Sequence, residues 1–229
     1  MVLQGKSFDP NWMAEYGDAV VTPQKAVSVV QPGMRVFLGT GCATPVTLVH
    51  ALVARAGELA DIEITQLLTR GDAPYATREL ASCFPVNCFF ISANVRSIIQ
   101  QGMGDYTPIS LSDIPKLLSS GRMPLDVAMI QITPPDENGM CSLGVSVDVT
   151  KTAAENARMV IAEVNPNMPR THGNSQIHVH DIDFLVPVDV PVIENILAEE
   201  RPGTEEIGEY LSPGLREVFE KQKGSRGAL

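Results

Sequence analysis

The sequence is poor in the residues that build metal centres and disulfide frameworks. It has four histidines and four cysteines in 229 residues. The cysteines, Cys42, Cys83, Cys88 and Cys141, form no C-x-x-C pair and have no zinc-like spacing. Cys83 and Cys88 are close in the sequence, and we expect buried free thiols there rather than a disulfide. His178 and His180 share one face of an expected strand, but no third ligand follows nearby. We therefore expect no metal site.

Positive charge is also scarce, and long apolar runs are absent. The chain has 17 basic and 27 acidic residues, a formal net charge of -10. This argues against a nucleic-acid partner, because phosphate binding requires a basic face. An anionic substrate would need local positive groups or helix N-termini. No 18 apolar residues run without interruption, and the first twelve residues hold no apolar core of signal-peptide length. We expect a soluble, cytoplasmic protein with no membrane segment.

Strand-like and helix-like segments alternate along the chain, which is 44% hydrophobic. We expect strands at 34–40, 62–69, 88–94, 126–134, 144–150, 160–165 and 176–188, and helices at 45–59, 95–102, 110–121 and 150–159. This succession predicts an α/β domain with an open, mostly parallel sheet flanked by helices. After residue 198 the composition becomes charged and rich in Pro and Gly. We expect a domain over 1–198 and a divergent tail over 199–229, partly helical or frayed.

A glycine-rich turn, GTGCATP at 39–45, follows the first expected core strand and leads into a helix. Glycines let the backbone approach a ligand closely, and the helix N-terminus offers N–H donors to an anion. Thr44 is the expected helix cap. Two interpretations stay open: a tight structural turn, or a cradle for a carboxylate, thioester or oxyanion. The candidate residues are Gly39, Thr40, Gly41, Cys42, Ala43 and Thr44.

Two further segments place polar side chains at strand ends, where parallel sheets bind ligands. In PPDENG (134–139) two prolines stiffen the chain before residues that either face a cleft or form a solvated turn. In NVR (94–96) the planar fork of an arginine either binds a carboxylate or phosphate or lies on the surface. The candidate pocket residues are Asn94, Arg96, Pro135, Asp136, Glu137, Asn138 and Gly139.

Taken together, these loops resemble the N-terminal half of the acetyl-CoA hydrolase/transferase family, class I CoA transferases that include 4-hydroxybutyrate CoA-transferases. The resemblance covers about residues 10–195. The matching segments are GTGCATP (39–45), NVR (94–96), GDYTPISLSDIPKLL (104–118), PLDVAMIQITPPDENGMCSLGVSVD (124–148) and NPNMPRTHGNSQIHVHDID (165–183). It implies an open α/β CoA transferase domain that moves CoA from an acyl-CoA to a carboxylate such as acetate, through a glutamyl-CoA intermediate. Gly39–Ala43 then supply oxyanion N–H donors, and 136–139 form a wall of the carboxylate pocket.

The resemblance also implies that the catalytic residue is not in this chain. The family's nucleophilic glutamate lies in the C-terminal half, in a stretch resembling H-T-E-M-F-S-D-G, which this sequence lacks. We assign no role to the tail glutamates: Glu199, Glu200, Glu205, Glu206, Glu209, Glu217 and Glu220. Two smaller departures are Ser92, where glycine is usual, and His180, where serine is usual.

Several consequences follow from the resemblance. The expected partners are an acyl-CoA, a short-chain carboxylate and a C-terminal transferase half or subunit, in a homo- or hetero-oligomer. CoA thioester enters as substrate, with no bound cofactor. The isolated chain is expected to be inactive. The alternatives are a non-catalytic remnant that binds an acyl group or a partner, and a truncated product whose exposed apolar face dimerises or aggregates.

Overall fold

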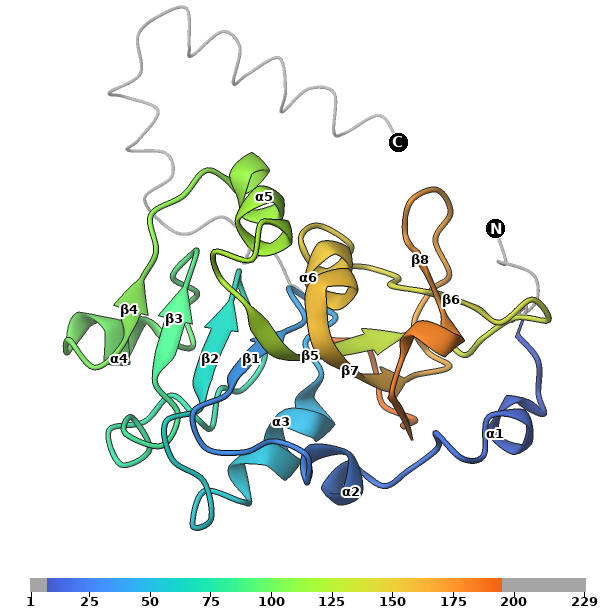
Figure 1. Ribbon diagram of the computed structural model, residues 1–229, viewed down its shortest axis with the longest axis horizontal. Coiled ribbons are helices and arrows are strands. Elements are labelled where there is room, and N and C mark those ends of the chain that lie inside the picture. The colour runs from blue at the N-terminus through green and yellow to red at the C-terminus, as the bar shows by residue number, and fades with distance from the viewer. Residues whose placement is uncertain (1–7, 195–229) are drawn as a thin grey trace, which may run out of the picture. The chain divides into compact units, whose positions relative to one another are not determined.

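Seven parallel strands form the central sheet of the computed structural model, which describes residues 8–194 (Figure 1). Across the sheet the order is β4-β3-β2-β1-β5-β7-β9, and every neighbouring pair is parallel. This confirms the expected open α/β sheet. The expected boundary at 198 and the tail lie outside the described residues. The strands are β1 (Arg35–Leu38), β2 (Glu63–Gln66), β3 (Val86–Cys88), β4 (Asp105–Tyr106), β5 (Leu125–Ile132), β7 (Ala157–Val164) and β9 (Phe184–Pro187).

Helices cover both faces of this sheet, and a short antiparallel pair stands apart from it. The pair is β6 (Met140–Ser142) with β8 (Gln176–His178). None of the described helices is long and apolar enough to cross a bilayer. Two 3-10 turns lie at Leu111–Asp113 and Val179–Asp181. The helices are α1 (Trp12–Glu15), α2 (Pro23–Val27), α3 (Val46–Val53), α4 (Arg96–Gln100), α5 (Ile114–Ser119) and α6 (Thr150–Asn156).

The core has two layers, one on each face of the sheet. Along β1, Val36 and Leu38 pack with α2 and α3, whereas Phe37 packs on the opposite face with α5 and α6. Figure 1 shows these two pairs of helices on opposite sides of the strands. Successive side chains of a strand point to opposite faces, and both faces are covered here. The central strands are therefore apolar almost throughout, as in β5.

Four local expectations are wrong. The strand expected at 88–94 is β3, which ends at Cys88, and turns follow it. The helix expected at 45–59 ends at Val53, and Thr44 does not cap it. Its N-cap position is Pro45, with no side-chain cap bond, because the Thr44 hydroxyl donates to the Gly41 carbonyl oxygen at 2.8 Å.

The other two errors concern apparent strands. Residues 144–150 alternate like a strand but form turns, because Gly144 has a positive φ of 64° and Asp148 bonds the backbone of the following helix. Residues 176–188 form β8, a 3-10 turn and β9 rather than one strand. The ring of His178 accepts the N–H of His180 at 3.2 Å and starts that turn.

A bidentate ion pair joins the two central strands β1 and β2. Arg35 and Glu63 face each other in the register, and their two N–H···O bonds measure 2.8 and 2.9 Å. Both side chains are about one-quarter exposed. Burial alone raises the pKa of Glu63, but the hydrogen bonds and charge of Arg35 outweigh it and leave that pKa below its ordinary value of 4.5.

We predict that Arg35→Met lowers the free energy of unfolding by about 1–2 kcal/mol, less than for a fully buried pair because water screens this one. The pair stabilises the fold fully above pH 4.5, and this contribution is lost as the pH falls through the lowered pKa of Glu63. Urea unfolding of both proteins between pH 7 and 3 measures it. A difference between them that stays constant below pH 4.5 would contradict this assignment.

Candidate functional site

The glycine-rich loop 39–45 lies where the strand order reverses. The chain runs outward from β1 to β4 and then returns to β5 on the other side of β1. Open parallel sheets bind ligands at the carboxyl ends of strands at such a point. The N–H of Gly39 donates to the Met129 carbonyl oxygen at 2.8 Å, and a Cβ at position 39 would lie 3.3 Å from that oxygen. Glycine therefore lets the loop start directly against β5.

The amide groups of this loop are not all available to a ligand. Four of the six N–H groups in 39–44 donate to carbonyl oxygens of the protein, at 2.7–3.4 Å. For the N–H groups of Thr40 and Cys42, no acceptor is found among the described residues. Thr40 is buried and Cys42 half-buried. The candidate N–H donors to a ligand are therefore reduced from the six in 39–44 to the two on Thr40 and Cys42.

Residues 144–150 form the neighbouring wall of the loop. The Thr40 hydroxyl donates to one carboxylate oxygen of Asp148 and lies 3.3 Å from the Thr150 hydroxyl. The second oxygen of Asp148 accepts the N–H groups of residues 149 and 150 at 2.5 and 3.1 Å, at the start of α6. At Gly41, whose φ is +57°, a Cβ would lie 2.7 Å from Ser146 Oγ. Asp148 therefore ties the glycine loop to α6.

The segment after β2 closes the other side of the loop. The N–H of Gly41 donates to the Leu68 carbonyl oxygen at 2.7 Å, and the N–H of Arg70 donates to the Thr44 hydroxyl at 3.1 Å. The Thr69 hydroxyl donates to the side chain of Gln66 at 2.7 Å. Two hydrogen bonds thus join the segments that follow β1 and β2.

Asn94 connects this assembly to the end of β3. Its Nδ2 donates to the Thr69 hydroxyl at 3.2 Å and to the Gly71 carbonyl oxygen at 3.1 Å. The Ser92 hydroxyl donates to its Oδ1 at 2.5 Å. The structure therefore brings Asn94 close to the glycine loop. However, both the nitrogen and the oxygen of its side-chain amide are already hydrogen-bonded within the protein. Arg96 is exposed at the first position of α4 and has no ion pair among the described residues.

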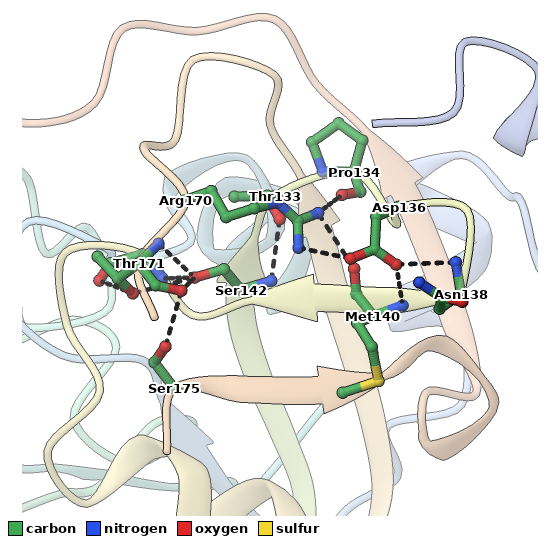
Figure 2. Close-up of polar contacts among 10 residues, drawn as sticks. Thr133, Pro134, Asp136, Asn138, Met140, Ser142, Arg170, Thr171 and Ser175 are labelled. Carbon is green, nitrogen blue, oxygen red and sulfur yellow. Dashed lines mark hydrogen bonds and ion pairs between the residues drawn. The ribbon is translucent and has the colours of Figure 1, made fainter. Parts of the chain in front are cut away.

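The turn 134–139 belongs to a different network (Figure 2). One carboxylate oxygen of Asp136 accepts the N–H groups of Asn138 and Met140 at 2.9 and 3.0 Å, and the other pairs with Arg170 at 3.2 Å. The guanidinium of Arg170 also donates to the carbonyl oxygens of Pro134 and Met140, at 2.8 and 3.1 Å. The carboxylate of Asp136 therefore holds the turn together.

The outer side of this turn meets the N-terminal segment. The Pro135 carbonyl oxygen accepts the N–H of Asp9 at 3.1 Å. Glu137 and Asn138 are exposed, and a cavity beside Glu137 is lined by Phe8, Asp9 and Pro10. No hydrogen bond joins 134–139 to 39–45 in the described part of the chain. Membership of this turn in the same pocket stays a prediction, and the described contacts do not bring the two loops together.

The N-terminus of α3, expected to help bind an anion, is already occupied. The N–H of Leu48 in its first turn donates to the buried carboxylate of Glu163 at 2.8 Å. Across residues 8–194, no group of three or more His, Cys, Asp or Glu residues is placed to hold a metal ion. The N–H groups of the loop, and not the N-terminus of α3, are therefore the groups available to bind an anion at this site.

Sequence reasoning missed Thr69, Arg70, Asp148 and Glu163. Thr69 and Arg70 follow an apolar strand just as 39–45 does, so the same signal could have found them. Asp148 lies close before a helix, where a carboxylate is favoured, and it accepts N–H groups at the start of that helix. Glu163 is a single acid in an apolar strand, which signals a buried, partnered carboxylate.

Comparisons with known proteins identify the family. Residues 6–196 match the model of the acetyl-CoA hydrolase/transferase N-terminal domain. The 4-hydroxybutyrate coenzyme A transferase of Clostridium kluyveri is 42% identical over 183 residues, which cover 80% of this chain and 43% of that protein. The succinyl-CoA:acetate/propanoyl-CoA:succinate CoA transferase of Fasciola hepatica is 36% identical over 213 residues, 91% of this chain and 42% of that protein.

Solved structures agree with this match. RipA from Yersinia pestis aligns with a TM-score of 0.78 at 30% identity, over 87% of this chain and 49% of that one. A 4-hydroxybutyrate CoA-transferase from Porphyromonas gingivalis aligns with a TM-score of 0.69 at 32% identity, over 82% and 44%. The chain thus spans less than half the length of each of these relatives. With a family match over most of its length, the chain belongs to the acetyl-CoA hydrolase/transferase N-terminal domain family.

Proposed function

We propose that this domain forms one side of a CoA transferase active site, at the carboxyl ends of β1 and β5. The attacking glutamate comes from a C-terminal transferase domain. The observation that carries the proposal is the pair of N–H groups on Thr40 and Cys42, which have no acceptor among the described residues at the reversal of strand order. Membership of the family supports the reaction type.

The proposed reaction proceeds by covalent catalysis. A glutamate oxygen attacks the thioester carbonyl carbon of an acyl-CoA, and the C–S bond breaks to release the CoA thiolate. The thiolate attacks the glutamyl carbonyl of the resulting anhydride, which releases the first carboxylate and leaves glutamyl-CoA. An acceptor carboxylate such as acetate then reverses the two steps and leaves as the new acyl-CoA. CoA is thus a substrate, and the glutamate is regenerated.

The residues of this domain stabilise negative charge on the reacting carbonyl oxygen and hold the loop and the substrate in position. Each tetrahedral stage places negative charge on a carbonyl oxygen, and the N–H groups of Thr40 and Cys42 stabilise it; loss of one such donor typically costs about 100–1000-fold in rate. Asn94 holds the Thr69–Gly71 segment against the loop. Arg96 pairs with an anionic group of a substrate through its planar fork. The complete enzyme is an oligomer of such paired domains.

Reconstitution tests this function. The purified chain is mixed with the C-terminal half of a related 4-hydroxybutyrate CoA transferase, and acetate-dependent CoA exchange from butyryl-CoA is followed. We predict no transfer by the chain alone and transfer by the mixture, because the nucleophile and the donors come from different domains. Replacing the partner's nucleophilic glutamate with glutamine is the control, and it is expected to abolish transfer.

Two results would overturn the proposal. One is turnover by the chain alone that survives replacement of every glutamate in 199–229. The other is a mixture that forms a stable complex, binds acyl-CoA and still shows no exchange. That second result would favour the alternative, a domain that binds an acyl group or a partner without catalysis.

A further inference from the structure

Glu163 is the only acidic or basic side chain that is fully buried in the described part of the chain. It lies in β7 with no exposed surface. A buried carboxylate is tolerated only where hydrogen bonds replace the lost water. Burial raises the pKa of Glu163, while hydrogen bonds from Leu48, Gln131 and Thr47 oppose this. Its bonding partners therefore decide what this residue does.

The two carboxylate oxygens of Glu163 bind two different elements. One accepts the N–H of Leu48 in α3 at 2.8 Å, and the other accepts Nε2–H of Gln131 in β5 at 2.9 Å. The side-chain oxygen of Gln131 lies 3.4 Å from Nδ2 of Asn165. The same Nδ2 donates to the Val190 carbonyl oxygen at 2.9 Å. A buried polar chain thus links α3, β5, β7 and the segment after β9.

This chain of bonds fixes the exit of the glycine loop. Leu48 is the third residue of α3, and α3 begins directly after the loop. The entry of the loop is fixed separately, by the bond from Gly39 to Met129. A carboxylate at a helix N-terminus also interacts favourably with the helix dipole. The loop is therefore held between an anchor on β5 and an anchor on Glu163.

We propose that Glu163 is a positioning residue, which anchors the first turn of α3 and so sets the conformation in which Thr40 and Cys42 present their N–H groups. Because its carboxylate occupies the helix N-terminus, a substrate anion meets the loop and not the helix. The catalytic consequence rests on the proposed function, whereas the effect on loop conformation does not.

The pattern of donors and acceptors gives a sharp test. In Glu163→Gln the new amide nitrogen faces a donor, either the N–H of Leu48 or Nε2 of Gln131. If the Gln131 amide turns over, the mismatch moves to Asn165. In the exchanged pair Glu163→Gln/Gln131→Glu, Gln at 163 accepts from Leu48 and donates to Glu at 131, whose other oxygen accepts from Asn165, so these three bonds are again matched. The exchange should therefore restore the anchor.

The reactivity of the Cys42 thiol reports how open the loop is. Its thiol is half-buried, whereas the other three cysteines are buried. In the full chain, iodoacetamide labelling followed by peptide mass mapping gives the rate at each cysteine. For Glu163→Gln we predict that Cys42 reacts about tenfold faster, as expected for local opening around an unsatisfied buried bond. Labelling at Cys83, Cys88 and Cys141 stays slow, and the exchanged pair returns the Cys42 rate to within about twofold of wild type.

The control is Ile161→Val, which removes one methyl group from the same face of β7 and leaves the hydrogen bonds of Glu163 to α3 and β5 in place. The proposal is overturned if Cys42 reacts no faster in Glu163→Gln than in Ile161→Val, or if the exchanged pair folds but leaves Cys42 fast. Should Glu163→Gln not fold, Gln131→Met, which removes one donor to the carboxylate and the acceptor of Asn165 Nδ2, is expected to speed Cys42 labelling, and an unchanged rate there overturns the proposal. The experiment measures labelling and not turnover. The labelling rate of Cys42 can therefore be interpreted even if the reconstitution fails.

Discussion

Gly144→Ala is expected to lower the free energy of unfolding by about 3–4 kcal/mol, from backbone strain and overpacking together. Gly144 has a φ of +64°, a conformation that disfavours any side chain. A Cβ there would lie 2.2 Å from Sδ and 2.4 Å from Cγ of Met168, and 3.1 Å from the Pro169 carbonyl oxygen. Met168 is itself buried, so it cannot move into solvent. Urea unfolding followed by circular dichroism measures the loss.

Two variants separate the strain from the contact. Gly121 has a similar φ of +70° but nothing within 4 Å of a Cβ, so Gly121→Ala should cost only about 1–2 kcal/mol. In Gly144→Ala/Met168→Ala the contact is gone, and the double variant should lose less than the sum of the two single losses. Equal losses of unfolding free energy for Gly144→Ala and Gly121→Ala would contradict the prediction, because they would show that the close approach to Met168 adds nothing to the cost.

Gly144 also shows why a local pattern misled the prediction of a strand at 144–150. The segment VSVDV alternates as a strand does. However, the N–H of Gly144 donates to the Ser142 hydroxyl at 3.1 Å, and its carbonyl oxygen accepts the Thr171 hydroxyl at 3.1 Å. Figure 2 shows how Ser142 and Thr171 come together from separate segments. Thr171 is 27 residues away in the sequence, so alternation alone could not reveal the turn.

The class of fold was accessible from the sequence because parallel strands covered on both faces are apolar throughout. The apolar runs around β1, β2, β5 and β7, the helical spacing of α3 and the alanine content of α6 carry that signal. The ends of elements were less accessible. At 176–188 an alternating pattern concealed a break, because the turn depends on one bond between the His178 ring and the His180 amide.

The candidate site was accessible in part for the same reason. The loop at 39–45 follows a strong apolar strand, and its glycines mark a close approach that the structure contains at Gly39 and Gly41. Its neighbours depend on the strand order, which places β2 and β5 on either side of β1. The sequence does not give that order, so it could not show that Asp148 and Thr69 lie beside the loop. For the same reason it gave no ground to separate the turn 134–139 from the loop.

The largest functional effect is expected at Gly41. It lies between Thr40 and Cys42 with a φ of +57°, and a Cβ would lie 2.7 Å from Ser146 Oγ. In the reconstituted complex, Gly41→Leu is expected to lower turnover about 100-fold or more, because the loop must move and misplace its N–H donors. The loss of stability should stay near 1–2 kcal/mol, since the clashing hydroxyl is on a short side chain that can rotate. Steady-state CoA exchange and urea unfolding of the same preparations give both numbers.

Gly33 provides the matched control for this prediction. It has a φ of +82°, nothing within 4 Å of a Cβ, and lies before β1, at the end of the strand opposite to the loop. Gly33→Leu therefore carries the backbone strain without disturbing the donors, and turnover should stay within about threefold of wild type while stability falls by a similar 1–2 kcal/mol. If both variants lose turnover in proportion to stability, the loop is a structural turn. If Gly41→Leu loses far more turnover than Gly33→Leu at a similar loss of stability, the N–H groups on either side of Gly41 act on the reaction.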